Sequence, residues 1–229
     1  MTQRDAFWRL PRLSEARLYL CLGLRRERGD LEPFLDAVLV SGVDVVQMRE
    51  KDATHDELCT AAALFRAASR RHGALFMVND DPSLAVELDA DGVHVGQEDP
   101  PPHEARAIVG RDRLVGRSTH SVSQIRRALG EDCDYFAVGP VHATPTKAGR
   151  TPVGLEPVRY AAHSAGTRPW FVTGAMGTAT APAVIEAGAR RLVVVRAITE
   201  ADTPATIVGR LAAMLRDPAL TSVAPDSLR

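Results

Sequence analysis

The segment Val45-Val46-Gln47-Met48-Arg49-Glu50-Lys51 begins as an apolar run and ends in an amide, a guanidinium, a carboxylate and an ammonium group. This order is typical of a buried strand that carries polar side chains at its carboxyl end. The same pattern recurs in Leu75 to Asp80, in Gly92 to Asp99 and in Tyr135 to Lys147. Because a stretch with helical periodicity follows each segment, the sequence predicts parallel strands with their chemistry on one rim of a barrel.

Strand and helix patterns alternate eight times along the chain. The strands are expected at Leu18 to Leu22, Asp44 to Met48, Ala74 to Val78, Gly92 to Val95, Leu114 to Gly116, Tyr135 to Val138, Trp170 to Thr173 and Leu192 to Val195. The helices are expected at Leu31 to Val40, Asp56 to Arg71, Ser83 to Leu88, His103 to Val109, Val122 to Leu129, Leu155 to His163, Ala181 to Ala187 and Thr206 to Leu215. Such alternation favours a single-domain (β/α)8 TIM barrel over an open doubly wound sheet.

Composition limits the class of protein. The 229 residues are 45% hydrophobic, enough for one barrel domain, which we place at residues 17–217, with a poorly ordered extension at residues 1–16 and a tail at residues 218–229. Lys and Arg total 28 against 29 for Asp and Glu, so we expect no nucleic-acid or anionic-membrane partner. Without a bilayer-spanning stretch or a signal-peptide core, the chain is expected to be cytoplasmic. The three cysteines are interpreted as reduced packing residues.

The rim is predicted to bind anions. Gln47, Arg49 and Lys51 alternate along the strand end, so their side chains point the same way if the strand geometry persists. Two cations on one face suit a multiply charged anion, although a solvated strand end would look the same. A second anion site is predicted where Thr173 to Gly177 precedes a helix and where Val195 to Ala197 ends the last strand.

Two carboxylates predict a metal site on the same rim. Asp80 and Asp99 follow the third and fourth strands, which are neighbours in a barrel, so the two side chains could share a Mg²⁺ ion. Each residue could instead cap the helix that follows it. His94, His120 and His142 also lie near strand ends, but they form no metal-ligand pair in the sequence, and we assign them structural or peripheral roles.

In this order and spacing, five motifs resemble those of the thiamine phosphate synthase family. They are Gln47-Met48-Arg49-Glu50-Lys51, Asn79-Asp80, Asp91-Gly92-Val93-His94-Val95-Gly96-Gln97-Glu98-Asp99, Gly116-Arg117-Ser118-Thr119-His120 and Val138-Gly139-Pro140-Val141-His142-Ala143-Thr144-Pro145-Thr146-Lys147. The resemblance implies Mg²⁺-dependent condensation of 4-amino-2-methyl-5-hydroxymethylpyrimidine diphosphate with a thiazole phosphate, giving thiamine phosphate and diphosphate.

The resemblance also assigns roles to individual positions. The pyrimidine diphosphate would be bound by Gln47, Arg49, Lys51, Asn79, Ser118 and Lys147, and Mg²⁺ by Asp80 and Asp99. The thiazole phosphate would be bound by Thr144 and Thr146 and by the backbone around Ala175, Val195 and Arg196. Within these sets, Arg49, Lys51 and Lys147 would be catalytic, because they stabilise the charge of the departing diphosphate.

The chain departs from the family pattern in the loop Thr173-Gly174-Ala175-Met176, at Arg117 and at Arg196. Ala175 replaces the second glycine of a typical Ile-Gly-Gly-Ile loop, and we expect the loop to adopt a negative φ there or to shift outward. Arg117 replaces an apolar residue and Arg196 a serine, so each either adds a cation to the site or faces solvent. Two alternative functions remain, a thiazole tautomerase-like paralogue and a non-catalytic barrel that binds thiazole phosphate.

Overall fold

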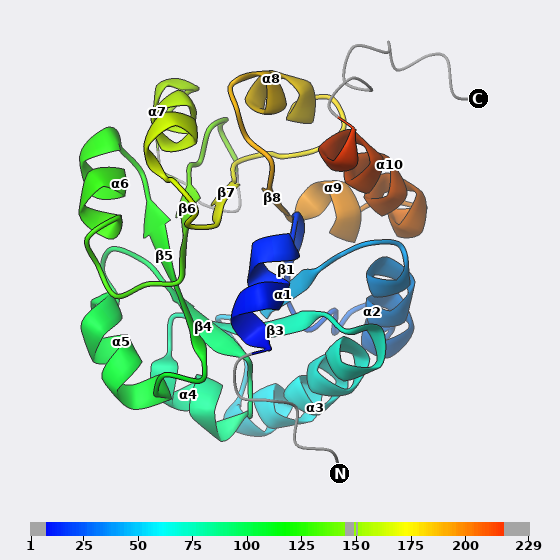
Figure 1. The fold of residues 1–229 in the computed structure, drawn as a ribbon. Coiled ribbons are helices and arrows are strands. Elements are labelled where there is room, and N and C mark those ends of the chain that lie inside the picture. Colours follow the sequence, from blue (N-terminus) through cyan, green and yellow to red (C-terminus); the bar gives the residue numbers. More distant parts are fainter. Residues whose placement is uncertain (1–7, 145–148, 150, 218–229) are drawn as a thin grey trace.

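Eight parallel strands form a closed barrel in which each strand pairs with the next and β8 pairs with β1 (Figure 1). The strands are β1 (Leu18–Leu22), β2 (Val45–Met48), β3 (Leu75–Asn79), β4 (Gly92–Val95), β5 (Leu114–Thr119), β6 (Tyr135–Val138), β7 (Trp170–Val172) and β8 (Leu192–Val194). The structure is a computed structural model that describes residues 8–144, 149 and 151–217. It confirms the single-domain (β/α)8 barrel that the sequence predicts.

Helices surround the barrel as an outer layer, except the first, which lies across one end of the barrel (Figure 1). They are α1 (Arg9–Glu15), α2 (Leu31–Val40), α3 (His55–His72), α4 (Pro82–Glu87), α5 (Pro102–Val109), α6 (Val122–Ala128), α7 (Glu156–Ser164), α8 (Ala181–Glu186), α9 (Arg196–Thr199) and α10 (Pro204–Arg216). The eight predicted helices are all present, and α1 and α9 are additional. The largest error in a strand concerns β5, which continues to Thr119 and so includes Arg117 and Ser118.

The expectation that residues 1–16 are poorly ordered is wrong for residues 8–16. They contain α1, which crosses the amino end of the barrel (Figure 1). Leu13 is 1% exposed and packs inside the barrel, while Arg12 donates to Asp44 at 2.9 Å and Arg9 donates to Asp91 at 2.8 Å. Contacts with residues this distant in sequence hold a helix too short to be stable alone. Residues 1–7 and 218–229 lie outside the described part of the chain.

Two apolar clusters occupy different layers. The larger lies between the strands and the helices, and the smaller fills the barrel interior with side chains that include Leu13, Tyr19, Tyr135 and Phe171. Toward the carboxyl ends of the strands, the inward positions become polar: Gln47 and Ser118 are buried, and Asn79 is half-buried. The apolar interior therefore ends in a polar floor beneath the rim.

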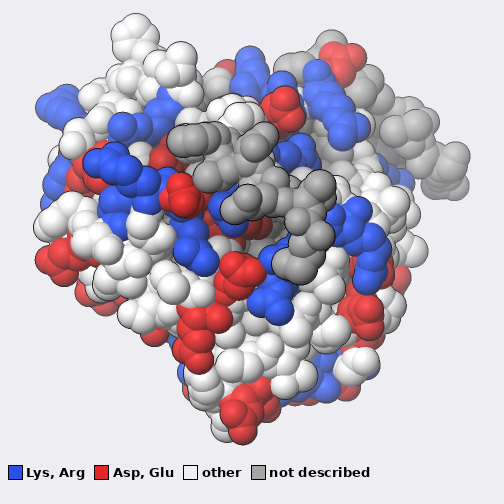
Figure 2. Space-filling view, turned by 60° about the horizontal axis from the view of Figure 1, so that its bottom comes forward, with Lys and Arg blue, Asp and Glu red and all other residues white. Residues whose placement is uncertain are grey.

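The surface carries charges of both signs. Lys and Arg side chains alternate with Asp and Glu side chains over the face drawn in Figure 2. Among the described residues, no helix is both long and apolar enough to cross a membrane.

Candidate active site

A cavity of about 910 Å³ opens at the carboxyl ends of the strands. Eleven of the thirteen site residues predicted from the sequence line it: Gln47, Arg49, Lys51, Asn79, Asp80, Asp99, Ser118, Thr144, Ala175, Val195 and Arg196. The other two, Thr146 and Lys147, lie outside the described residues. The barrel thus brings residues from the carboxyl ends of seven strands to one cavity large enough for two small substrates.

The alternation predicted for the end of β2 continues past the strand. Gln47, Arg49 and Lys51 all line the cavity, whereas Glu50 points away and accepts a hydrogen bond from the Leu24 amide at 3.2 Å. On the cavity floor, Gln47 Nε2 donates to Asn79 Oδ1 at 2.8 Å. This bond between neighbouring strands fixes the orientation of both amides and leaves the Gln47 carbonyl oxygen and the Asn79 amino group to face a ligand.

Asp80 and Asp99 lie in contact across the cavity wall. Burial raises the pKa of Asp80 to about 6, and a hydrogen bond to Asp99 and the negative charge of that residue add to the rise. Arg49 and Lys51 lie near enough to oppose it. Two carboxylates held this close favour either a shared proton or a shared cation, because two neighbouring negative charges repel each other. This is the oxygen-rich donor set that Mg²⁺ binds in proteins.

The helix-capping alternative fails for both carboxylates. Asp81, not Asp80, caps α4, since its side chain accepts hydrogen bonds from the Ser83 and Leu84 amides at 2.8 and 3.0 Å. Helix α5 begins after Pro101 without a side-chain cap. Asp99 instead accepts a hydrogen bond from the Gly96 amide at 2.6 Å, within its own loop. Asp80 has a φ of 66°, an uncommon conformation that brings its side chain to the cavity.

Sequence reasoning missed the floor of the cavity. His94 lines it rather than lying at the periphery, with Nε2 2.9 Å from Ser118 Oγ and Nδ1 3.1 Å from the Tyr135 hydroxyl. His120 also lines the cavity. Gly116 makes this packing possible, because a Cβ there would lie 2.2 Å from the Tyr135 ring and 2.6 Å from His94 Nδ1. The glycine in the middle of a strand was the available signal.

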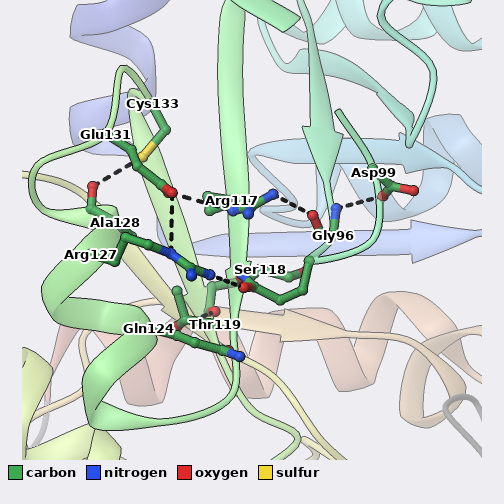
Figure 3. Close-up of polar contacts among 12 residues, drawn as sticks. Gly96, Asp99, Arg117, Ser118, Thr119, Gln124, Arg127, Ala128, Glu131 and Cys133 are labelled. Carbon is green, nitrogen blue, oxygen red and sulfur yellow. Dashed lines mark hydrogen bonds and ion pairs between the residues drawn. The ribbon is translucent and has the colours of Figure 1, made fainter. Parts of the chain in front are cut away.

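Arg117 neither enters the cavity nor faces solvent, the two outcomes expected from the sequence. Its side chain is 5% exposed, lies 3.5 Å from Glu131 and donates to the Gly96 carbonyl, as Figure 3 shows. Glu131 also lies 3.4 Å from Arg127, which donates to the Gln97 side chain. One half-buried carboxylate therefore links two arginines that hold the loop carrying Asp99.

Ala175 is left-handed, with a φ of 50°, so the expected negative φ is wrong. The loop is fixed on both sides. A Cβ on Gly174 would lie 2.4 Å from the Val141 amide, and the Thr180 hydroxyl donates to the Ala175 carbonyl at 2.9 Å. Arg196 lines the same end of the cavity at the start of α9 and lies 3.9 Å from Glu200.

The chain matches the protein-family model for thiamine monophosphate synthase over residues 18–198. It belongs to the thiamine monophosphate synthase family. A thiamine-phosphate synthase from Acidothermus cellulolyticus is 52% identical over 204 residues, which cover 89% of this chain and 96% of the relative. Another from Streptomyces avermitilis is 48% identical over 206 residues, covering 90% and 96%. The family resemblance seen in the sequence is confirmed.

A solved structure supports the same assignment. The thiamine phosphate pyrophosphorylase from Pyrococcus furiosus superposes with a TM-score of 0.78 at 27% identity and covers 90% of this chain and 98% of its own. A 3-hexulose-6-phosphate synthase, at 21% identity and a TM-score of 0.58, shares the fold alone. Membership of the thiamine monophosphate synthase family makes the chain an enzyme, a transferase of thiamine biosynthesis.

In this member of the thiamine monophosphate synthase family, we expect Ala175→Gly to stabilise the fold by about 1 kcal/mol, because glycine adopts a positive φ without the steric cost that a Cβ adds. Urea unfolding measures the change. Ala213→Gly, in the exposed surface of α10, is the matched control and should lose about 1 kcal/mol. Equal losses in both variants would contradict the strain at Ala175.

Proposed function

We propose that this cavity catalyses the Mg²⁺-dependent condensation of 4-amino-2-methyl-5-hydroxymethylpyrimidine diphosphate with thiazole phosphate, giving thiamine phosphate and diphosphate. The observation that carries the proposal is the Asp80–Asp99 contact beside Arg49 and Lys51, in a cavity that also includes the Ala175 loop. Cations and a two-carboxylate site together suit a diphosphate. The names of the relatives support thiamine-phosphate synthesis, and the chemistry of the residues supports these substrates.

The diphosphate end of the cavity is formed by the ends of β2, β3 and β4. Arg49 and Lys51 supply positive charge there, and Lys147 is proposed to join them from the loop after β6. Mg²⁺ bound by Asp80, Asp99 and the diphosphate oxygens would neutralise part of the leaving group's charge. These cations contact the oxygens whose negative charge grows as the bond breaks, and so stabilise the transition state more than the bound substrate.

The pyrimidine is proposed to lie on the polar floor. Gln47 and Asn79 present amide groups whose mutual hydrogen bond fixes their orientation, and Ser118 adds a hydroxyl held against His94. Groups fixed in advance lose little freedom when a ligand binds, so they orient the ring at low entropic cost. The reacting methylene would then lie between this floor and the cations at the diphosphate end.

The thiazole phosphate is proposed to bind at the opposite end of the cavity. Thr144 and the backbone around Ala175 and Val195 would contact it, with Thr146 beyond the described residues and Arg196 at the rim. Arg196 is 46% exposed, which leaves its guanidinium accessible to a ligand. A charged donor there can offset a loop that lacks the family's second glycine.

The reaction then needs positioning and charge, without a nucleophilic side chain. The carbon–oxygen bond breaks with both electrons leaving on the diphosphate, and the aminopyrimidine carries the resulting benzylic-type cation. The thiazole nitrogen donates its lone pair to this carbon, forming the new carbon–nitrogen bond. The enzyme contributes by holding the two substrates in line and by stabilising the leaving group.

A diphosphate-release assay with both substrates tests the proposal. We expect release only when both substrates and Mg²⁺ are present, with thiamine phosphate formed in equal amount. Isomerisation of a thiazole carboxylate phosphate without any use of the pyrimidine diphosphate would favour the tautomerase-like alternative. Binding of thiazole phosphate without turnover would favour the non-catalytic barrel.

Arg196→Ser should raise the KM for thiazole phosphate about tenfold, equivalent to about 1.4 kcal/mol, with little change in the KM for the pyrimidine diphosphate. The reason is the loss of a charged donor at the thiazole-phosphate end, next to Ala175. Steady-state kinetics with each substrate varied in turn measures the effect. Ala175→Gly should leave this KM unchanged or lower it. If Arg196→Ser has no effect while Ala175→Gly weakens binding, compensation by Arg196 is the wrong explanation.

A further inference from the structure

A cluster of three potential metal ligands lies on the outer layer of the barrel, apart from the active-site cavity. His55 and Cys59 are one turn apart at the start of α3, and Glu87 ends α4. His55 Nε2 lies 3.5 Å from Cys59 Sγ and 3.0 Å from Glu87 Oε1, and all three ligand atoms lie within 4.8 Å of one another. None of the three residues lines the active-site cavity.

These distances suit a tetrahedral transition-metal ion. With a metal–sulfur bond of about 2.3 Å and metal–nitrogen and metal–oxygen bonds of about 2.0–2.2 Å, tetrahedral angles place nitrogen roughly 3.6 Å from sulfur and roughly 3.4 Å from oxygen. The separations in the cluster are 3.5 and 3.0 Å. A cation could therefore enter with small side-chain movements and no rearrangement of the backbone.

The spacing on α3 favours the same conclusion. Residues four apart on a helix share one face, the arrangement that lets two side chains of one helix hold one metal ion. The helix is fixed at this end by a capping box, formed by Thr54, which directly precedes His55, and Glu57, two residues after His55. Two ligands on a rigid turn lose little freedom when they bind a metal, and Glu87 then adds the third from a different helix.

We propose that His55, Cys59 and Glu87 bind a divalent cation of the Zn²⁺ class and so join the start of α3 to the end of α4. A nitrogen, a thiolate and one carboxylate select Zn²⁺ or Co²⁺ over Mg²⁺, which prefers oxygen ligands. On binding, the Cys59 thiol releases its proton to solvent, and a water molecule completes the coordination. The site is independent of the proposed Mg²⁺ site and of the proposed reaction.

Co²⁺ is the probe that tests the proposal. The full-length, tag-free protein, reduced and treated with chelator, is titrated with Co²⁺ in excess Mg²⁺. We expect stoichiometric Co²⁺ to produce a thiolate-to-metal charge-transfer band and tetrahedral visible bands, which Zn²⁺ then abolishes by competition. Cys59→Ser should remove the charge-transfer band, and His55→Ala and Glu87→Gln should each weaken Zn²⁺ binding tenfold or more. Zn²⁺ should also raise the Tm of the wild type but not of Cys59→Ser.

His103 and Glu104 provide the matched control. They are an exposed imidazole and carboxylate 3.8 Å apart, and neither belongs to the metal-ligating cluster found among the described residues. His103→Ala and Glu104→Gln should keep the band and the affinity. Equal unfolding of wild type and Cys59→Ser in chelator shows that the variant folds. The proposal is overturned if wild type gives no charge-transfer band, if the band survives in Cys59→Ser, or if Zn²⁺ affinity is the same in all variants.

Discussion

Asp80→Asn and Asp99→Asn should each reduce turnover by at least about a hundredfold, the loss of a few kcal/mol of transition-state stabilisation that follows removal of one metal ligand. Both carboxylates line the cavity in contact with each other, and neither caps a helix. Diphosphate release measured across a range of Mg²⁺ concentrations tests this. Asp81→Asn is the matched control, since asparagine also caps helices and the side chain of Asp81 serves α4. Near wild-type activity with unchanged Mg²⁺ dependence in either site variant would contradict the metal assignment.

Although Asp80→Asn should reduce turnover, it should increase the stability of the folded protein at neutral pH. The pKa of Asp80 in the folded protein, about 6, lies above its ordinary value of 3.8, so folding favours the protonated carboxyl. Its contribution to stability is therefore fully present below pH 3.8 and is lost as the pH rises through about 6. In chelator, the Tm of Asp80→Asn relative to wild type should increase over this interval. A relative Tm that is constant with pH would show that Asp80 titrates normally.

Arg117→Met should destabilise the protein by about 3 kcal/mol, because it removes a buried guanidinium, leaves the half-buried Glu131 paired with Arg127 alone and leaves the Gly96 carbonyl without its side-chain donor. Urea unfolding measures this loss. Arg126→Met is the control. Arg126 lies on the same stretch of chain but is exposed, with its guanidinium over the Tyr160 ring, so its loss should leave the stability nearly unchanged.

Two further measurements separate a local effect of Arg117 from general weakening. The double variant Arg117→Met/Glu131→Gln should be more stable than Arg117→Met alone, because it removes the half-buried charge of Glu131 that the single variant leaves without Arg117. The single variant should also need more Mg²⁺ for half-maximal activity, since Gly96 positions Asp99. If Arg117→Met matches Arg126→Met in stability and in Mg²⁺ dependence, the ion pair does not hold this loop.

The barrel could be predicted from the sequence because its signal is local and repeated. Short apolar strands, polar residues at their carboxyl ends and amphipathic helices recur eight times, and parallel pairing then brings Gln47, Asn79, Asp80, Asp99 and Ser118 to one rim. The alternation of side chains at the end of β2 predicted that Gln47, Arg49 and Lys51 face the same way, and all three line the cavity.

The errors arise where distant contacts decide the outcome. Helix α1 depends on Asp44 and Asp91, far along the chain, so its own seven residues give little sign of it. The prediction for Arg117 rested only on its positive charge, because the predicted strand ended before it. In the structure Arg117 is part of β5, and its side chain points outward toward Glu131. At Ala175, the general preference of alanine for negative φ led to the wrong prediction of the backbone conformation. The contacts of Gly174 and Thr180 fix the loop on both sides and hold Ala175 at a positive φ.

Because the barrel interior is packed with side chains, the active-site cavity is closed at its base and opens at the carboxyl ends of the strands. Tyr19, Tyr135 and Phe171 fill the barrel and α1 covers its amino end, so traffic between cavity and solvent passes over the rim. The proposed pyrimidine position lies deepest, beside buried Gln47 and Ser118, whereas Ala175 and Arg196 are exposed. A substrate bound at the exposed Ala175 and Arg196 end would block access to the deeper position beside Gln47 and Ser118. In the proposed reaction, the pyrimidine diphosphate would therefore bind before the thiazole phosphate.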